Sequence, residues 1–343
     1  MRIGITGISG SFGSALCADL SQDPNNIIVG MTRDELRAEQ IMARHPGNVR
    51  VMVIAAGLQD VSAMERAFRD CDVLVHAAAL KRISGSVYAT EEIVKVNILG
   101  TINVLEVARK LGIKKTLFIS SDKACEATNL YGSSKFTAEC LAVQSNAFIY
   151  PATGGMVSCT RWGNVVGSRG SVVHIWRKQR DSGGPITVTD PRMTRFIMTM
   201  QEAVQFTKQS IDNMQGGEIF IPKLSSASMV DLAQAVRDEH TMGRNAITYT
   251  GLRPGGEKVH EILLSQEEPR RTLPAENGMM LASGMPYFLV QPSHRTWSSQ
   301  PYDKMPIGDV LTEGFIYSSL TAPKLSRETL RAIVQAVPNT QEE

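Results

Sequence analysis

The stretch TGISGSFG, residues 6–13, begins at Thr6, the last residue of the short apolar segment Arg2–Thr6. It overlaps at its end with the helix-length segment Ser11–Leu20. Its three glycines have the spacing GxxGxxG and are Gly7, Gly10 and Gly13. Glycines at these positions let a turn close tightly and bring backbone amides up to a pyrophosphate, which also meets the positive end of the following helix. Because the motif lies between a predicted strand and a predicted helix, it predicts a dinucleotide-binding turn.

Through the first half of the chain, short β-branched runs alternate with amphipathic segments of helix length. The predicted strands are Arg2–Thr6, Ile27–Met31, Val51–Ala55, Val73–Ala77, Thr116–Ser120 and Met156–Arg161. The predicted helices are Ser11–Leu20, Val61–Arg69, Glu91–Leu111 and Tyr131–Ser145. This alternation predicts βαβ units in an α/β fold with a doubly wound parallel sheet of Rossmann type, whose ligands bind beyond the carboxyl ends of the strands.

After Asn164 the alternation fades and turn signals become frequent, which predicts a smaller, substrate-binding region. A helix near Gln201–Asn213 and a strand at Ile219–Ile221 are expected to return to the main sheet. The predicted division is therefore a dinucleotide-binding domain of residues 1–165 joined by 198–225, and a substrate-binding region of residues 166–197 and 226–343.

Composition narrows the class of partner. The 343 residues are 43% hydrophobic and 20% charged with a net charge of +2, which is typical of a soluble globular protein and not of a nucleic-acid or membrane-surface binder. The five cysteines are scattered and predict buried free thiols without a metal site. No signal peptide and no apolar run of about 20 residues is evident, so a cytoplasmic protein that binds a small molecule is expected.

The end of the second strand, MTRDE, bears on the choice of cofactor. An acidic residue at this point normally accepts hydrogen bonds from the ribose hydroxyls of NAD, whereas arginine accommodates the 2′-phosphate of NADP. Thr32 and Arg33 precede Asp34 here, and Arg33 can give a phosphate a bidentate contact. The sequence favours NADP, with NAD as the alternative if Asp34 turns inward.

Two short motifs predict an acid–base site. The fifth strand ends in SSDK, residues 120–123, and YGSSK follows with Tyr131 and Lys135 four residues apart, on one face of a helix. A nearby ammonium and the positive cofactor ring favour the phenolate, so that Tyr131 can act as a base while Lys135 holds the cofactor ribose. With the glycine turn, this pattern resembles the short-chain dehydrogenase/reductase superfamily, in which Ser121 matches the Ser/Thr that bonds the reacting oxygen and Asn97 the cofactor-positioning Asn.

A more specific resemblance extends from about residue 2 to residue 292. The motifs that carry it are HAAALK (76–81), SSDKA, NLYGSSK, RWGNVVGSRGSVV (161–173), TDPRMTRF (189–196), GGEIFIPK (216–223) and RPGGEKVHE (253–261). In this order they are similar to the inverting UDP-N-acetylglucosamine 4,6-dehydratases, extended short-chain dehydrogenases/reductases of bacterial polysaccharide and pseudaminic acid biosynthesis. The resemblance also implies a homo-oligomer, either a dimer or a hexamer.

The resemblance implies a net dehydration, so the enzyme is a lyase. Hydride leaves carbon 4 of the sugar for the bound cofactor, the proton on carbon 5 and the hydroxyl of carbon 6 are eliminated, and the hydride returns to carbon 6. Tyr131 would deprotonate the carbon 4 hydroxyl, and Asp122 and Lys123 would share elimination and proton return at carbon 5. Lys123 is the candidate carbon 5 base, provided that positive charge or burial keeps it partly neutral.

Two sets of binding residues complete the prediction. The expected cofactor site comprises Gly7, Gly10, Ser11, Phe12, Gly13, Thr32, Arg33, Ala77, Asn97, Tyr131 and Lys135. The expected substrate site comprises Lys81, Asn164, Arg169, Arg195, Arg253 and Glu257. The amide of Asn164 and the three guanidinium groups suit a diphosphate, and Glu257 can accept hydrogen bonds from ribose hydroxyls.

The chain departs from the family pattern at three points. Gly57 stands where an Asp usually contacts adenine, Arg82, Ile83 and Ser84 replace the usual His-Val-Pro, and the RPGEK motif has gained a glycine, Gly255 or Gly256. These changes put adenine recognition and the shape of the sugar pocket in question.

Two other functions fit parts of the pattern. A nucleotide-sugar 4-epimerase, or an epimerase that also dehydrates, begins with the same hydride removal but does not require the Asp122–Lys123 pair. A non-catalytic redox-sensing binder would not need Ser121, Tyr131 and Lys135 together, and all three are present.

Overall fold

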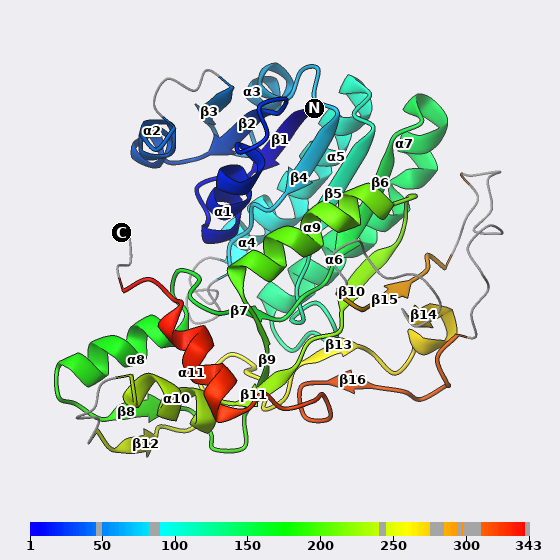
Figure 1. The fold of residues 1–343 in the computed structure, drawn as a ribbon. Helices are drawn as coiled ribbons and strands as arrows, with labels where there is room; N and C mark the ends of the chain where they lie inside the picture. Colours follow the sequence, from blue (N-terminus) through cyan, green and yellow to red (C-terminus); the bar gives the residue numbers. More distant parts are fainter. Residues whose placement is uncertain are drawn as a thin grey trace.

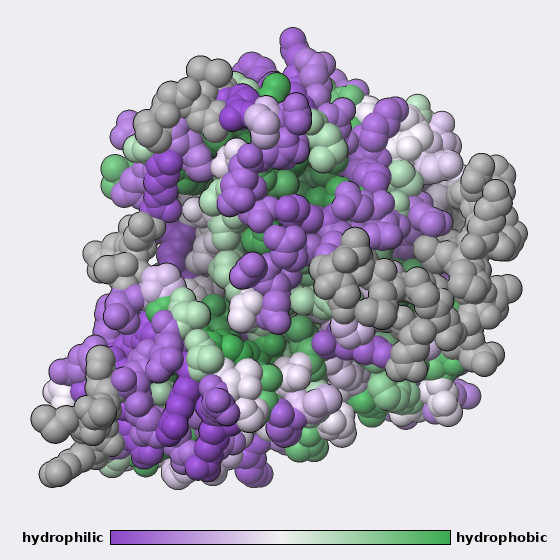
Figure 2. All heavy atoms as spheres, in the orientation of Figure 1, coloured by the Kyte–Doolittle hydropathy of each residue, from purple (hydrophilic) through white to green (hydrophobic). Residues whose placement is uncertain are grey.

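The computed structural model describes residues 1–45, 50–81, 90–239, 245–274, 285–293, 297 and 310–339. Most of these residues form a large sheet with helices on both faces, and a smaller part with short strands and helices lies beside it (Figure 1). Hydrophilic residues cover much of the visible face, and the hydrophobic residues there gather mainly where the two parts meet (Figure 2).

Within the described residues, the main sheet has nine strands in the order β14-β15-β10-β6-β5-β4-β1-β2-β3. Their bounds are β1 Arg2–Thr6, β2 Ile27–Thr32, β3 Val51–Ala55, β4 Val73–His76, β5 Lys115–Ile119, β6 Met156–Thr160, β10 Ile219–Pro222, β14 Thr272–Pro274 and β15 Tyr287–Val290. From β3 to β10 all neighbours pair in parallel. The run β3-β2-β1-β4-β5-β6 is the strand order of doubly wound dinucleotide-binding sheets, so the predicted fold class is confirmed.

The six strands predicted in the first half agree with the observed strands to within one residue at each end. They are recognisable because strands of a parallel sheet, covered by helices on both faces, are apolar almost throughout. All four residues of β4, for example, are buried.

Helices cover both faces of this sheet. Their bounds are α1 Ser11–Leu20, α2 Glu35–Ala43, α3 Val61–Ala67, α4 Thr90–Ile93, the π-helix η1 Val94–Leu99, α5 Gly100–Leu111, α6 Leu130–Gln144, α7 Asn146–Thr153 and α9 Met200–Asn213. Helices α1 and α9 pack together on the face in front in Figure 1, and α3, α5 and α6 lie behind the sheet. The predicted helix Glu91–Leu111 is therefore interrupted by a π-helical segment, which is a frequent mark of functional sites.

The smaller part has its own apolar core, which includes Val173, Trp176, Leu232 and Leu330. The elements outside the main sheet and its covering helices are β7 Asn164–Val165, α8 Val172–Asp181, β8 Ile186–Val188, β9 Thr194–Met198, β11 Ser226–Ser228, α10 Met229–Arg237, β12 Ile247–Tyr249, β13 Ile262–Leu264, the 3₁₀-helix η2 Pro269–Arg271, β16 Tyr317–Ser318 and α11 Arg327–Gln335. The strands form the small sheets β11-β9-β7, β12-β8 and β13-β16.

The chain crosses between the two parts more than once. Helix α9 and strand β10, in the segment 198–225, lie on the main sheet. Strands β14 and β15 do so too, although they fall within the range assigned to the substrate-binding region. The reason is that all four residues of β15 are buried and pair antiparallel with β10, which extends the sheet at that edge.

A buried arginine on α8 holds the C-terminal end of α11. The Arg177 guanidinium on α8 donates to the carbonyls of Val334, Val337 and Pro338 at 2.8, 2.9 and 3.0 Å, and to both oxygens of Glu239. The Val334 carbonyl also accepts from the N–H of Val337, and Val337 and Pro338 follow α11, so Arg177 anchors the last turn of the helix together with the residues after it.

A buried ion cluster connects the main sheet to the segment between β13 and η2. Arg161, at the end of β6, is 1% exposed and binds two carboxylates, Glu139 on α6 and Glu268 before η2. The five N–H donors of its guanidinium go to the four carboxylate oxygens and to the carbonyl of Leu263. Burial of such a cluster is tolerable because every donor has a partner.

The five cysteines are free, and four of them are buried, as the sequence predicts. Among the described helices, none combines the length and the apolar character needed to span a membrane.

Candidate active site

The glycine turn lies between β1 and α1 and depends on its glycines. Gly7 has φ +71°, and a Cβ there would lie 2.7 Å from the backbone of Ala78. A Cβ on Gly13 would lie 2.4 Å from the carbonyl oxygen of Gly7. Gly10 precedes α1 without a side-chain cap, so the first turn of the helix meets the carboxyl edge of the sheet with backbone groups alone. These features fit a dinucleotide phosphate group.

Phe12 and Ala77 frame the turn. The Phe12 ring packs edge-on against Trp162, with 4.9 Å between ring centroids. Ala77 follows β4, and its N–H donates to the carbonyl of Thr6 at 3.3 Å. Both predicted residues therefore lie at the carboxyl edge of the main sheet, next to the glycine turn.

Thr32, Arg33 and Asp34 at the end of β2 are the residues expected to decide between NAD and NADP, and each has different neighbours. The hydroxyl of Thr32 lies 2.6 Å from that of Ser9 in the glycine turn. Asp34 caps α2 by accepting from the N–H of Arg37 at 3.1 Å, and it also pairs with that guanidinium at 3.2 Å. Arg33 is exposed, and a Cβ at Gly57 would lie 3.7 Å from its Cγ.

Asn97 lies buried in the π-helix and connects two elements of the site. Its amide oxygen accepts from the N–H of Leu80 at 2.8 Å, and its amide nitrogen donates to the Leu80 carbonyl and to the Ser134 hydroxyl at 3.0 and 2.9 Å. Ser134 in turn donates to the carbonyl of Tyr131 at 2.7 Å. Asn97 therefore holds the segment after β4 against the helix that carries Tyr131.

Ser121, Asp122 and Lys123 follow β5 at the carboxyl edge. The Ser121 hydroxyl donates to Asp122 Oδ1 at 2.8 Å, and Lys123 Nζ donates to both oxygens of that carboxylate at 2.9 and 3.0 Å. Lys123 also contacts Asn164 Oδ1 at 3.3 Å and Glu261 Oε1 at 3.3 Å. The Asp122–Lys123 pair is thus part of a partly buried cluster rather than an ion pair in open solvent.

Burial acts on the two members of this pair in different ways. For Asp122, burial raises the pKa, and the nearby Glu261 raises it further against the opposing charge of Lys123. For Lys123, burial alone would lower the pKa, but the carboxylates of Asp122 and Glu261 outweigh burial and raise it. The two carboxylates therefore favour the ammonium form of Lys123, so a role as the carbon 5 base requires Lys123 first to pass on a proton.

Tyr131 and Lys135 are both buried on α6, one turn apart. Lys135 Nζ donates to the carbonyl of Ile119 at 2.5 Å and lies 4.1 Å from the centroid of the Phe118 ring. Burial lowers the pKa of Lys135 to about 8. Burial raises the pKa of Tyr131, and the cation that most opposes this effect is Lys123, assisted by hydrogen bonding with Ser121. The ammonium that favours a Tyr131 phenolate is thus that of Lys123.

Four of the six predicted substrate residues surround a hollow beside this cluster. The hollow is lined by Lys123, Thr128, Asn129, Asn164, Arg195, Arg253, Gly256, Glu257, Lys258 and Glu261. Arg253 pairs with Glu257 through its guanidinium and donates from its backbone N–H to Glu257 Oε2 at 3.1 Å. Arg253 lies exposed at the rim of the hollow, whereas the Glu257 side chain is only 6% exposed.

Arg195 lines the hollow, and its guanidinium also binds the backbone of the neighbouring segment. It is buried, and its guanidinium donates to the carbonyls of Lys258, Val259 and Thr194 at 2.9, 3.0 and 2.8 Å. Most of its donors are therefore engaged in holding the segment around residue 258.

Lys81 and Arg169 are not among the lining residues but lie beside the glycine turn. The N–H of Arg169 donates to Ser11 Oγ at 2.9 Å, and Lys81 Nζ donates to the Arg169 carbonyl at 3.0 Å. Burial and the charges of Arg169 and Lys123 lower the pKa of Lys81. Positive charge therefore extends from the glycine turn toward Lys123.

The extra glycine of the RPGGEK motif has a structural explanation. Gly255 and Gly256 have φ values of 107° and 80°, and a Cβ on Gly256 would lie 2.3 Å from the carbonyl oxygen of Thr128. The Gly256 carbonyl accepts from Thr128 Oγ1 at 2.6 Å and from Asn129 Nδ2 at 3.3 Å. The two-glycine turn thus docks onto the loop that leads to Tyr131. Arg82, Ile83 and Ser84, the third departure, lie outside the described residues.

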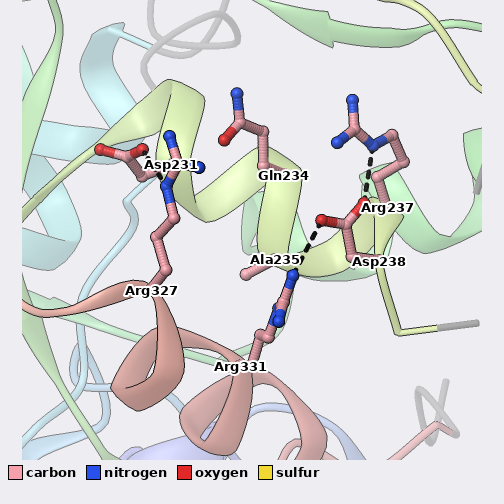
Figure 3. Close-up of a pocket in the computed structure, with 7 residues that line it drawn as sticks. All are labelled: Asp231, Gln234, Ala235, Arg237, Asp238, Arg327 and Arg331. Atoms are coloured by element: carbon pink, nitrogen blue, oxygen red, sulfur yellow. Dashed lines mark hydrogen bonds and ion pairs between the residues drawn. The ribbon is translucent and has the colours of Figure 1, made fainter.

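A second hollow lies between α10 and α11 (Figure 3). Arg327 and Arg331 reach across it toward Asp231 and Asp238, at 3.5 and 3.2 Å, and Arg237 also pairs with Asp238. Its charges pair with one another across the two helices, and it contains none of the predicted site residues. In the described part of the chain, no cluster of three His, Cys, Asp or Glu side chains could hold a metal ion.

A glycine turn that opens a doubly wound sheet, a Ser at the end of β5 and the Tyr131–Lys135 pair on α6 define an extended short-chain dehydrogenase/reductase. The family model described as polysaccharide biosynthesis protein matches residues 3–283. The chain belongs to this family.

Relatives with known names support the resemblance seen in the motifs. The chain is 35% identical over 331 residues to the UDP-N-acetylglucosamine 4,6-dehydratase (inverting) of Campylobacter jejuni subsp. jejuni serotype O:23/36 (strain 81-176), with 94% of each chain covered. It is 32% identical over 269 residues to a UDP-glucose 4-epimerase of Rickettsia canadensis, with 77% of each covered. The structure of Pen from Bacillus thuringiensis superposes with a TM-score of 0.84 at 28% identity, covering 97% of this chain and 96% of that one. The resemblance to inverting 4,6-dehydratases is therefore confirmed.

Proposed function

We propose that the protein dehydrates UDP-N-acetylglucosamine to a UDP-4-keto-6-deoxy-hexosamine with inversion at carbon 5. The observation that carries this proposal is the Asp122–Lys123 pair, which is bonded through both carboxylate oxygens and lies within the electrostatic reach of Tyr131. Oxidation at carbon 4 alone needs a base and a hydride acceptor. An additional acid and amine beside Tyr131 provide for the elimination that follows.

The cofactor proposed is NADP, which when bound accepts a hydride and returns it. The described residues fit it at both ends: the glycine turn offers backbone groups for the pyrophosphate, and the end of β2 offers Arg33 for a 2′-phosphate. The carboxylate of Asp34 is engaged at the start of α2 and with Arg37, which speaks against a ribose contact. Gly57 adds no carboxylate beside Arg33, so nothing at that position competes with a phosphate for the guanidinium.

The proton transfers follow from the hydrogen bonds that join Ser121, Asp122 and Lys123. Tyr131, whose phenolate is favoured by Lys123, takes the proton of the carbon 4 hydroxyl. Lys123 passes one proton to Asp122, to which it is already hydrogen-bonded, and thereby becomes the neutral base that takes the proton from carbon 5. Asp122 delivers its proton to the carbon 6 oxygen, which leaves as water, and the double bond forms between carbons 5 and 6. The raised pKa of Asp122 suits this role as an acid.

We assign the UDP moiety to the positive charge around the site. Lys81 and Arg169, which lie between the glycine turn and Lys123, and Arg253 at the rim of the hollow are the proposed diphosphate contacts. Glu257 is the proposed ribose contact, and Asn164 binds near the sugar because it touches Lys123.

A homo-oligomer in the cytoplasm, acting in pseudaminic acid or related polysaccharide biosynthesis, completes the proposal. Leu99, Ile102 and Phe136 are exposed large hydrophobic side chains on neighbouring helices, with exposed fractions of 49, 43 and 50%, and they support association. The five free cysteines are consistent with a reducing compartment.

The alternative function is a nucleotide-sugar 4-epimerase, or a bifunctional dehydratase and epimerase, which the similarity to the Rickettsia canadensis protein favours. Mass spectrometry after incubation with UDP-N-acetylglucosamine separates them. Dehydration lowers the mass of the sugar nucleotide by one water, whereas an epimer keeps it. A product of unchanged mass would reject the dehydratase.

The cofactor proposal predicts the effect of two substitutions. Arg33→Ala is expected to weaken NADP binding by about tenfold or more and NAD binding little, because only NADP loses a charge-assisted contact. Gly57→Asp is expected to act in the same direction by pairing with Arg33. Isothermal titration of the cofactor-free protein measures both, with Arg66→Ala as an exposed control arginine on α3. Equal loss of NAD and NADP in Arg33→Ala would contradict the proposal.

A further inference from the structure

Glu261 has no role in the function proposed so far, yet it is held firmly beside Lys123. It lies directly before β13, where its N–H donates to Ser319 Oγ at 2.9 Å and its carbonyl accepts from the Ser319 N–H at 2.7 Å. Its side chain is only 4% exposed. The backbone near β16 thus places a buried carboxylate against the hollow.

The carboxylate of Glu261 faces positive charge but is poorly hydrogen-bonded. Oε1 lies 3.3 Å from Lys123 Nζ and 3.6 Å from Arg195 Nε, and Oε2 lies 4.0 Å from Lys258 Nζ. Among the described residues, Oε2 has no hydrogen-bond partner although it is buried. A buried carboxylate oxygen without a hydrogen bond is costly, which indicates that the charge of Glu261 serves the site rather than the stability of the fold.

Glu261 and Asp122 flank the same ammonium and differ in what their surroundings do to them. Burial tends to raise the pKa of Glu261, but Lys123, Arg195 and Lys258 together lower it, so Glu261 stays ionised. The pKa of Asp122 is raised. Charged or titratable groups that act on Lys123 or Glu261 are Asp122, Arg195, Tyr131, Lys81 and Lys258. Glu261 therefore supplies a constant negative charge beside a pair that must exchange a proton.

We propose that Glu261 is a positioning residue of the acid–base site, which holds Lys123 against Asp122 and keeps one proton shared between them until the elimination uses it. The proposal rests on the function proposed above. Loss of this charge makes the pair give up its proton at lower pH, so turnover fails earlier as the pH rises. The fold of the hollow is retained by the backbone bonds to Ser319 and by Arg195.

The test is Glu261→Gln, which keeps shape and removes charge. We expect kcat to fall by about tenfold to a hundredfold, less than the ~10²–10⁴-fold contribution of a direct acid or base. KM changes little, and the basic limb of the pH profile of kcat moves to lower pH. Glu261→Asp, which retains the charge, is expected to restore the limb toward its wild-type position.

Glu257→Gln is the matched control, because Glu257 is an equally buried carboxylate of the same segment that pairs with Arg253 and Arg195. It should raise KM and leave the limb unmoved. If Glu261→Gln lowered kcat at every pH without moving the limb, or only raised KM, the positioning role would be overturned.

A measurement without substrate separates this proposal from the proposed function. The pH dependence of Lys123 acetylation by acetic anhydride, followed by peptide mass spectrometry on the cofactor-loaded protein, reports how readily Lys123 loses its proton. We expect acetylation of Lys123 to begin at lower pH in Glu261→Gln than in the wild type, even if UDP-N-acetylglucosamine is not the substrate. An unchanged profile would overturn the proposal. Glu261→Ala, which also removes the charge, provides the same comparison if the Gln variant does not fold.

Discussion

Replacing Lys123 with alanine is expected to abolish elimination while leaving the first oxidation at carbon 4 possible. Lys123 is the amine nearest the Asp122 carboxylate, at 2.9 Å, and it takes the carbon 5 proton in the proposed sequence of transfers. A general base contributes about 10²–10⁴-fold, so turnover should fall by that amount. Transient reduction of the cofactor, followed by absorbance in single turnover, should slow because Tyr131 loses the neighbouring ammonium, but it should remain measurable, whereas deuterium incorporation at carbon 5 should be lost.

Tyr131→Phe is the complementary variant, because it removes the base for the carbon 4 hydroxyl and keeps the Asp122–Lys123 pair. It should lose the transient cofactor reduction itself. Added primary amines such as ethylamine should restore part of the activity of Lys123→Ala and none of that of Tyr131→Phe. Near-normal turnover and exchange in Lys123→Ala would place the elimination base elsewhere.

The largest effect on stability is expected from Arg161→Met. The substitution leaves Glu139 and Glu268, with side chains 2% and 9% exposed, facing each other without a counter-ion. Breaking a buried ion pair by removing one partner costs about 3–5 kcal/mol. Urea denaturation should show this loss, and adding Glu139→Leu and Glu268→Leu should recover much of it, because the buried charges are then gone. Equal midpoints for Arg161→Met and the wild type would contradict this account of the cluster.

The same cluster gives stability an acid dependence. Despite the opposing effect of burial, Arg161 and the hydrogen bonds from Ser265 lower the pKa of Glu268 to about 2. A carboxyl with a depressed folded-state pKa contributes stability that is complete above its unfolded value of about 4.3 and is lost as the pH falls toward the folded value. Unfolding measured from pH 6 to pH 2 should therefore show a steeper loss in the wild type than in Glu268→Gln. Parallel curves would argue against this origin of the acid sensitivity.

The sequence predicts the first half of the fold well, because each βαβ unit is encoded locally. The strand ends that carry Thr32, Ser121 and Lys123 follow directly from short apolar runs and their flanking turns. Strands β14 and β15 are not predicted, because they join the main sheet only through antiparallel pairing with β10, a contact that hydrophobic periodicity does not encode.

The candidate site is predicted in its residue types more than in its contacts. Arg195 is predicted from the sequence as a phosphate ligand, but its bonds to the backbone of the segment that it packs against are not. Glu261 ends a recognised motif, yet only the fold brings it to Lys123, and only the fold sets the protonation of that lysine. A residue's charge state depends on neighbours that are distant in sequence, which is why the sequence motifs alone do not show that two carboxylates flank Lys123.

The central claim is most directly tested by one NMR time course of the cofactor-loaded protein with UDP-N-acetylglucosamine in deuterated water. Our account predicts a 4-keto-6-deoxy product that has lost one water and carries one solvent deuteron at carbon 5, with inverted configuration there. A 4-epimer with an intact carbon 6 hydroxyl and protium at carbon 5 would contradict it.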